Sequence, residues 1–155
     1  MTRRGFVAAR TAETRVILQE VREETGHSLM FLEMIDRAGL SGVELLGPTG
    51  LLTWVAHRLD PAGAEFWAMV YIGESVTNCF VQRALRSAAD GAALCPLAHQ
   101  VMTLHHKDET RHIAAARAFL EARVAAMGSA RRRAFAATLG FLLEHFLGAT
   151  LYPTA

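Results

Sequence analysis

Two short motifs of the same form each place an acidic pair and a histidine about one helical turn apart. Glu23–His27 (EETGH) and Asp108–His112 (DETRH) both contain two consecutive acidic residues, and a histidine follows the second of them by three positions. In an α-helix, residues three positions apart lie on the same face, so each motif brings a carboxylate and an imidazole together only if its segment is helical. The motifs therefore favour a fold in which these groups project from two separate helices.

The composition favours the same fold class. Hydrophobic residues make up 52% of the 155 residues, aromatic residues only 8%, and proline occurs four times. Such a chain, rich in alanine and leucine, is more typical of packed helices than of a β-sandwich. Its length is that of one domain with its own core. We therefore predict an all-α helical bundle that forms a single domain over residues 1–155.

The hydrophobic periodicity predicts four long helices and a short apolar segment. The expected stop positions are Gly39, Gly91 and Gly128. Asp60 and Pro61 are expected to be the N-cap and the first residue of the second long helix. The predicted long helices cover residues 11–38, 61–89, 96–127 and 130–147, and the short segment covers residues 51–58.

Three further observations point to a metal site. His105 precedes Glu109 by four positions and His112 by seven, so three ligand-type side chains line up over two turns of one helix. Glu74 is a lone carboxylate on the apolar stripe of the helix between the two motifs. Buried ionisable groups are costly unless they have partners, and metal ions are natural partners. Carboxylate oxygens and imidazole nitrogens suit iron as the first choice and manganese as the second.

The remaining histidines and large apolar side chains receive structural interpretations. His57, His99 and His145 have no partners at ligand spacing, and His106 is expected to be exposed or to lie just outside the ligands. The aromatic and methionine side chains at helical spacing are expected to be core packing, although they are also candidates for lining a pocket. These are Phe31, Trp67, Tyr71 and Met102.

The sequence argues against nucleic-acid binding and membrane insertion. The formal net charge is only +1, which is unlike a nucleic-acid surface. The most apolar stretch, residues 135–152, contains Glu144 and His145, so a buried C-terminal helix is expected there in place of a membrane span. Cys79 and Cys95 lack metal or disulfide spacing. They are expected to be small buried hydrophobes in a reducing cytoplasm.

The whole pattern resembles the diiron oxygenases of the p-aminobenzoate N-oxygenase family, which have a ferritin-like bundle. The resemblance extends from about Leu18 to Phe119, and the histidine one turn ahead of the second motif separates that family from ferritins. Because they directly precede the motif glutamates, Glu23 and Asp108 are expected to accept the second ring N–H of an imidazole across the site. The resemblance implies a single ferritin-like diiron domain with six ligands, which are Glu24, His27, Glu74, His105, Glu109 and His112.

The same resemblance implies a function. Two iron ions, or manganese as the second choice, would activate O₂ and oxygenate a small organic substrate with help from an electron donor. N-oxygenation of an aromatic amine is the case known in the family. Two other readings stay open. One is a ferritin-like metal-binding or oxidase module without an organic substrate, in which His105 would be dispensable. The other is a metal-free helical remnant.

The sequence also departs from the family pattern. Family members draw a further glutamate ligand from a helix upstream of the first motif, and this chain has almost no sequence there. Glu20, one turn before Glu24 on the same face, is the nearest substitute. A truncation at the N-terminus and a reduced homologue are the alternatives. An incomplete bundle leaves an apolar face, which a second copy would cover in a homodimer.

Overall fold

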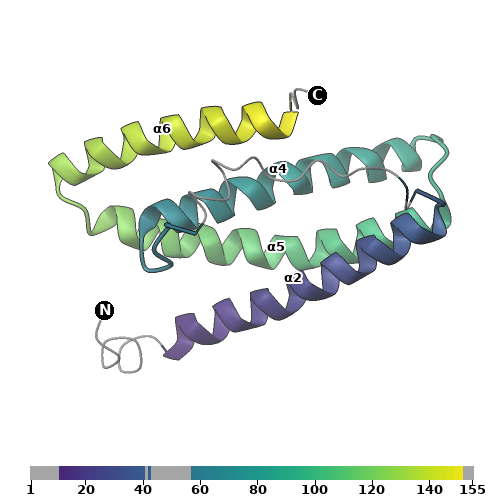
Figure 1. Cartoon of the computed structure of the whole chain (residues 1–155), viewed down its shortest axis with the longest axis horizontal. Coiled ribbons are helices and arrows are strands. Elements are labelled where there is room, and N and C mark those ends of the chain that lie inside the picture. Colours follow the sequence, from purple (N-terminus) through teal and green to yellow (C-terminus); the bar gives the residue numbers. More distant parts are fainter. Residues whose placement is uncertain (1–10, 41, 43–56, 152–155) are drawn as a thin grey trace. The chain divides into compact units, whose positions relative to one another are not determined.

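The computed structural model describes residues 11–40, 42 and 57–151. These residues form four α-helices and no β-strand, so the predicted all-α fold class is confirmed (Figure 1). The helices are α2 (Thr11–Arg37), α4 (Ala64–Ala89), α5 (Pro96–Ala125) and α6 (Ser129–Leu151). Most of the short apolar segment predicted over residues 51–58 lies outside the described residues. Within the described part of the chain, no helix has the length and apolar character that crossing a membrane requires.

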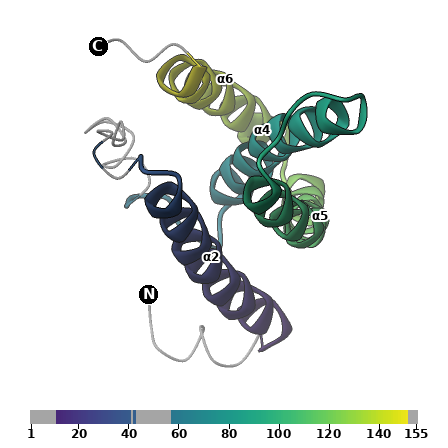
Figure 2. The same cartoon turned by 90° about the vertical axis from the view of Figure 1, so that its right-hand side faces the viewer.

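The chain divides into two compact units, and the division passes through α4 and α5. The first unit comprises Met1–Gly42 and Val81–Asp108, and the second comprises Val43–Phe80 and Glu109–Ala155. The second unit therefore contains about two thirds of α4 and the first unit the remaining third, whereas α5 is divided nearly in half. In the first unit, residues 90–95 connect the end of α4 to the start of α5, and the two helices run antiparallel from that loop (Figure 2).

Two glycines end α2 and α4 through the same backbone arrangement. After α2, Gly39 has a positive φ of 71°. The N–H of Leu40 donates to the carbonyl of Ile35, and the N–H of Gly39 donates to the carbonyl of Asp36, both at 3.0 Å. An equivalent pair of bonds closes α4 around Gly91, whose φ is 98°. This is a Schellman motif, which favours glycine because a Cβ is strained at positive φ. The stops predicted at these two glycines are confirmed.

Replacing Gly39 with alanine is expected to lower the free energy of unfolding by about 1–2 kcal/mol, because an L-residue is strained in the left-handed region. Gly140 is the matched control: it lies inside α6 and is exposed, and a Cβ added to it would meet no atom within 4 Å. Gly140→Ala is expected to raise the free energy of unfolding by about 0.5–1 kcal/mol. Urea denaturation followed by circular dichroism measures both. A stabilising Gly39→Ala would contradict the assigned helix stop.

The predicted start of α4 is wrong. The helix begins at Ala64 and not at Pro61. The carboxylate of Asp60 accepts a hydrogen bond from the backbone N–H of Ala62 at 2.9 Å. The backbone carbonyl of Asp60 accepts a second hydrogen bond, from the backbone N–H of Gly63, at 2.7 Å. The aspartate therefore stabilises a separate turn before the helix. The last helix also continues four residues beyond its predicted end at residue 147.

The core of the second unit lies where α4, α5 and α6 pack together. It is built around Ala64, Ala68 and Phe135, with Leu120, Val124, Met127 and Leu139 packed against them. The expectation of a buried C-terminal helix is wrong for most of α6, because only Phe135 and Leu142 are buried among its described side chains. A helix that packs on one side buries a single stripe and leaves the remainder to solvent.

The two cysteines differ from their predicted environment, because both are exposed. Cys95 immediately precedes the first residue of α5. The backbone N–H groups of Ala98 and Leu97 lower the pKa of the Cys95 thiol, as expected for a thiolate at a helix N-terminus. Cys79 lies inside α4. Periodicity marks which helix face is apolar, but it does not show whether another helix covers that face.

Candidate metal centre

In the first unit, ligand-type side chains gather around His27 of α2. The His27 side chain is buried, its Nδ1 lies 3.3 Å from Oε1 of Glu24, and its Nε2 lies 3.3 Å from Oδ2 of Asp108. The ring of His105 packs edge-on against it, with 4.6 Å between the ring centroids. The first motif and the start of the second therefore meet although they are about 80 residues apart in sequence.

In the second unit, a carboxylate-rich group forms around Glu109 of α5. Glu109 has an exposed fraction of 0%, and His112 is also buried. His112 Nδ1 lies 3.7 Å from Glu109 Oε2. Glu74 of α4 joins them, since one potential ligand atom from each of these three residues lies within 4.8 Å of the others. The lone carboxylate of α4 and the second motif are thus brought together.

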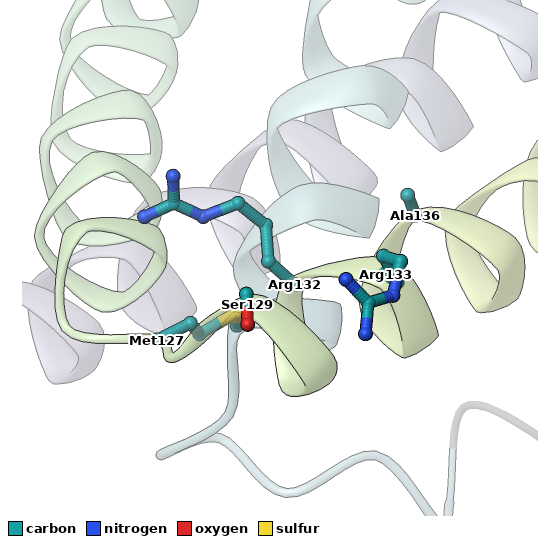
Figure 3. Close-up of a pocket in the computed structure, with 5 residues that line it drawn as sticks. All are labelled: Met127, Ser129, Arg132, Arg133 and Ala136. Atoms are coloured by element: carbon teal, nitrogen blue, oxygen red, sulfur yellow. The ribbon is translucent and has the colours of Figure 1, made fainter.

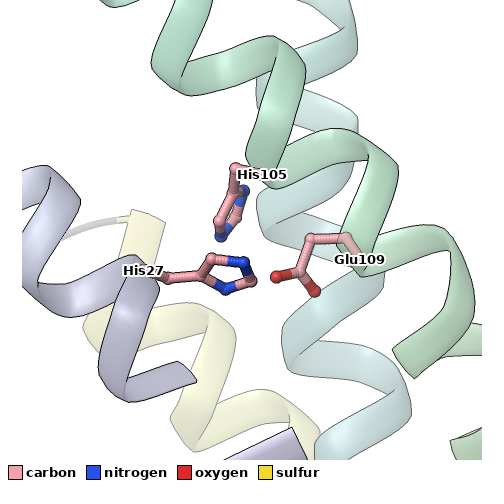
Figure 4. A group of neighbouring side chains, drawn as sticks. All are labelled: His27, His105 and Glu109. Carbon is pink, nitrogen blue, oxygen red and sulfur yellow. The ribbon is translucent and has the colours of Figure 1, made fainter. Parts of the chain in front are cut away.

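The unbroken helix α5 carries residues of both groups. His105, of the first group, and Glu109, of the second, are four positions apart on this helix. Figure 4 shows the His27 ring, from α2, beside the His105 ring, from α5, in the first unit. Phe31 covers another edge of the His105 ring at a centroid distance of 5.0 Å. The sequence predicts Phe31 as core packing or as a pocket-lining residue, and its contact with His105 of another helix could not be read from that spacing.

The two motifs share one local geometry. In each, Nδ1 of the histidine faces the glutamate three positions earlier, because the two side chains lie on the same helix face. The Asp108 carboxylate can only accept a hydrogen bond from Nε2 of His27, so it favours the His27 tautomer that carries its proton on Nε2. The lone pair of Nδ1 then faces Glu24. A carboxylate that fixes a histidine tautomer in this way is a common companion of metal-binding histidines.

Replacing Asp108 with asparagine is expected to weaken metal affinity about 10- to 100-fold, because an amide holds the His27 tautomer less well than a carboxylate. Isothermal titration with Mn(II), which does not react with O₂ during the measurement, gives the affinity. Asp90→Asn is the control, since Asp90 is an exposed acid in the α4–α5 connection. Equal affinities for the Asp108 variant and the unsubstituted chain would remove Asp108 from the site.

The other residues predicted near the site belong to neither group of ligand-type residues in the described part of the chain. Glu20 is half-buried on α2, and Glu23 accepts a hydrogen bond from the Gln19 side chain at 3.2 Å. Their predicted support of the ligands stays a prediction. His57, His99 and His145 are exposed and belong to neither group of ligand-type residues in the described part of the chain. His106 is half-buried.

The donor set suits hard and borderline metal ions. Its atoms are carboxylate oxygens and imidazole nitrogens, and the two exposed cysteines contribute no sulfur. This combination fits Fe(II) or Mn(II) better than copper(I) or an iron–sulfur cluster. The burial of Glu109 adds a second argument, because a buried carboxylate is costly without compensating positive charge. The residues present therefore fit a divalent metal.

A separate cavity lies in the second unit at the turn between α5 and α6 (Figure 3). Its volume is about 460 Å³, and it is lined by Met127, Ser129, Arg132, Arg133 and Ala136. The Arg132 side chain donates to the carbonyl of Val124 at 3.0 Å. None of the ligand-type residues lines this cavity, so it is distinct from the candidate metal centre.

Comparisons with known proteins place this chain in a family. The family model described as P-aminobenzoate N-oxygenase AurF matches residues 5–155. Uncharacterized protein Rv0885 of Mycobacterium tuberculosis and uncharacterized protein Mb0909 of Mycobacterium bovis are each 32% identical to this chain over 116 residues. The match covers 72% of this chain and 32% of each relative, so the chain spans about a third of the length of these relatives. No solved structure matches the chain. The chain belongs to the p-aminobenzoate N-oxygenase AurF family.

Proposed function

We propose that this chain carries the dinuclear iron centre of an O₂-activating oxygenase. The proposed ligands are Glu24, His27, Glu74, His105, Glu109 and His112. Family membership supports a diiron oxygenase as the kind of function. Each unit supplies part of this set, and the continuous helix α5 carries residues of both parts.

The observation that carries the proposal is the burial of Glu109 among ligand-type side chains. Its carboxylate is fully buried, with Glu74 and His112 close by in the second unit. Burying a carboxylate on an apolar helix face is destabilising, and an apolar side chain of similar volume would often be more stable there. A divalent cation offsets the negative charge of Glu74 and Glu109 together and gives both residues a common role.

The side chains of this chain would perform distinct tasks. Glu74 and Glu109 would neutralise the positive charge of the ions, and the imidazoles of His27 and His112 would bind through the nitrogen that faces a motif glutamate. Asp108 would hold the His27 ring in its tautomer. Phe31 would shield the His105 ring from water at the site's edge. When bound, two ferrous ions supply the electrons that activate O₂ for transfer of oxygen to a substrate.

The proposed substrate is a small organic molecule, and the family description favours the nitrogen of an aromatic amine. Such a reaction needs O₂ and an external electron donor as partners. The competing proposal is a ferritin-like metal-binding or oxidase module without an organic substrate. The burial of His105 against the rings of His27 and Phe31 favours the oxygenase, because a ferritin-type site would not need this histidine.

Metal stoichiometry tests the proposal directly. The full chain is loaded with Fe(II) without oxygen, desalted, and analysed for iron by elemental analysis. About two irons per chain are expected for a dinuclear site. Iron below about half an equivalent would contradict the proposal.

Loaded protein is then exposed to O₂ with p-aminobenzoate and a reductant. Oxidation of the amine nitrogen favours the oxygenase, whereas O₂ consumption without an oxidised amine favours the oxidase module.

A further inference from the structure

The cavity at the turn between α5 and α6 is lined by basic, small polar and apolar side chains, and none of its lining residues is acidic. Its volume of about 460 Å³ lies in the range that small organic ligands occupy. Met127 forms part of its apolar lining and also packs against the core of the second unit. The other four lining residues are exposed, so the cavity opens to solvent: Ser129, Arg132, Arg133 and Ala136. We call it the α5–α6 cavity.

Two of the three consecutive arginines near the start of α6 hold that helix against its neighbours. Arg131 forms an ion pair with the carboxylate of Glu65 and so ties α6 to α4. Arg132 donates to the carbonyl of Val124 at 3.0 Å and ties the start of α6 to the end of α5. A cation that binds the last carbonyls of a helix stabilises the end of that helix. These two arginines therefore have structural roles.

The third arginine, Arg133, has no such role. Its guanidinium makes no hydrogen bond and no ion pair with any residue in the described part of the chain, although it lines the α5–α6 cavity. Figure 3 shows its side chain leaving α6 in a different direction from that of Arg132. The hydroxyl of Ser129 lines the same cavity and also makes no hydrogen bond to a described residue. A charged donor and a neutral donor are thus available at one cavity.

The start of α6 adds backbone donors beside Ser129. The N–H of Arg132 donates to the carbonyl of Gly128 at 3.0 Å, so the N–H groups of Ser129 and Ala130 come before the first hydrogen bond of the helix. Gly128 has no side chain that could cap these groups. The first turn of α6 contains no acidic residue, although the positive end of the helix dipole favours a negative group there. A bound anion would satisfy both demands.

From these donors, we infer that the α5–α6 cavity binds a small phosphate monoester. The phosphate lies against the Arg133 guanidinium, the Ser129 hydroxyl and the first N–H groups of α6. The organic substituent lies against Met127 and Ala136. A phosphate group suits this site better than a carboxylate does, because its three terminal oxygens can accept from the guanidinium, the hydroxyl and the backbone donors together.

This binding site goes beyond the proposed iron chemistry. None of the ligand-type residues lines the α5–α6 cavity. Substitutions in the cavity therefore leave the donor set unchanged, and we expect the substituted chains to bind as much iron as the native chain. The phosphate site and the iron site can thus fail separately.

Titration of the full chain with phenyl phosphate, followed by the backbone amide NMR signals, tests the inference. The signals of Ser129 and Ala130 should shift to saturation, with a dissociation constant at or below about 1 mM. Inorganic phosphate should bind about 10-fold more weakly, because it has no apolar substituent. Benzoate should bind at least about 10-fold more weakly, because it has fewer acceptors and less charge. The inference would be overturned by the absence of saturable shifts, or by either comparison ion binding as tightly as phenyl phosphate.

A charge placed in the α5–α6 cavity separates a specific site from general attraction. Ala136→Glu should weaken phenyl phosphate binding at least about 10-fold, because the new carboxylate repels the phosphate. Ala137→Glu is the matched control: it makes the same change at the next position of α6, which is exposed and does not line the cavity. It should change the affinity less than about threefold, because exposed charges are screened. Equal weakening by both variants would overturn the site.

Removing the available guanidinium tests the role of Arg133. Arg133→Gln should weaken phenyl phosphate binding about 10-fold or more, because a charge-assisted hydrogen bond to the phosphate is lost. Arg83→Gln is the matched control, since Arg83 is an exposed arginine on α4 that does not line the cavity. Circular dichroism should show the same helical content in both variants, because both side chains are exposed. Unchanged affinity in Arg133→Gln would overturn the inference.

Discussion

Glu109→Gln is expected to abolish iron binding while leaving the metal-free fold intact. Glu109 is fully buried and lies one turn from both His105 and His112 on α5. The amide has nearly the same shape as the carboxylate but carries no negative charge, so it offsets no cationic charge. Iron per chain should fall from about two to below about half an equivalent. Elemental analysis after anaerobic loading and desalting measures this change.

Thermal unfolding separates a metal role from a merely structural one. Fe(II) should raise the unfolding temperature of the native chain, because a ligand that binds only the folded state stabilises it. It should not raise that of Glu109→Gln. Without metal, the variant should keep the helical circular dichroism of the native chain, because glutamine preserves the shape of the glutamate side chain. His57→Ala is the control for iron content, since His57 is exposed and outside the ligand groups. Unchanged iron in Glu109→Gln would refute the assignment.

Trp67→Ala is expected to cause the largest loss of stability in the second unit. Trp67 is fully buried on α4, and its ring lies 4.5 Å from that of Phe119 and 5.3 Å from that of Phe66, between centroids. The guanidinium carbon of Arg123 lies 5.6 Å from the Trp67 ring centroid. Truncating a buried tryptophan leaves a large cavity and costs about 3–5 kcal/mol. That is a large part of the total stability of a typical domain.

Urea denaturation followed by circular dichroism measures this loss. Phe141→Ala is the matched control, because Phe141 is an aromatic residue that is half exposed on α6, and it should cost less than about 1 kcal/mol. Trp67→Phe should fall between them. The Trp67 indole N–H has no hydrogen-bond partner among the described residues, so phenylalanine loses packing but no hydrogen bond. Equal losses in the two alanine variants would show that Trp67 does not anchor the core.

Helix ends could be predicted from the sequence where the backbone adopts a positive φ, which glycine favours. Gly39 and Gly91 occupy positive-φ positions that other residues enter with strain, so the sequence alone located the ends of α2 and α4. The start of α4 was less predictable. Asp60 has two ways to accept a nearby backbone N–H, and the structure uses a turn before the helix in place of a cap on it.

The ligand-type residues were predictable as members of helix faces but not as partners. Periodicity placed Glu109 and His112 on one face, because side chains three apart on a helix are neighbours whatever the tertiary structure. Two contacts depend on how the helices pack. Asp108 accepts a hydrogen bond from His27, 81 positions away, and the Phe31 ring packs on the His105 ring. No local spacing encodes those contacts.

The sequence by itself determined that the chain is helical, where glycine ends α2 and α4, and which side chains share each helix face. These features depend on interactions within a few residues, which the order of amino acids specifies directly. The tertiary structure decided which faces are buried: Cys79, Cys95 and Leu29 are exposed although they are apolar, whereas Glu109 is fully buried although it is charged. Burial depends on which helix covers which face, and contacts between residues distant in sequence decide that.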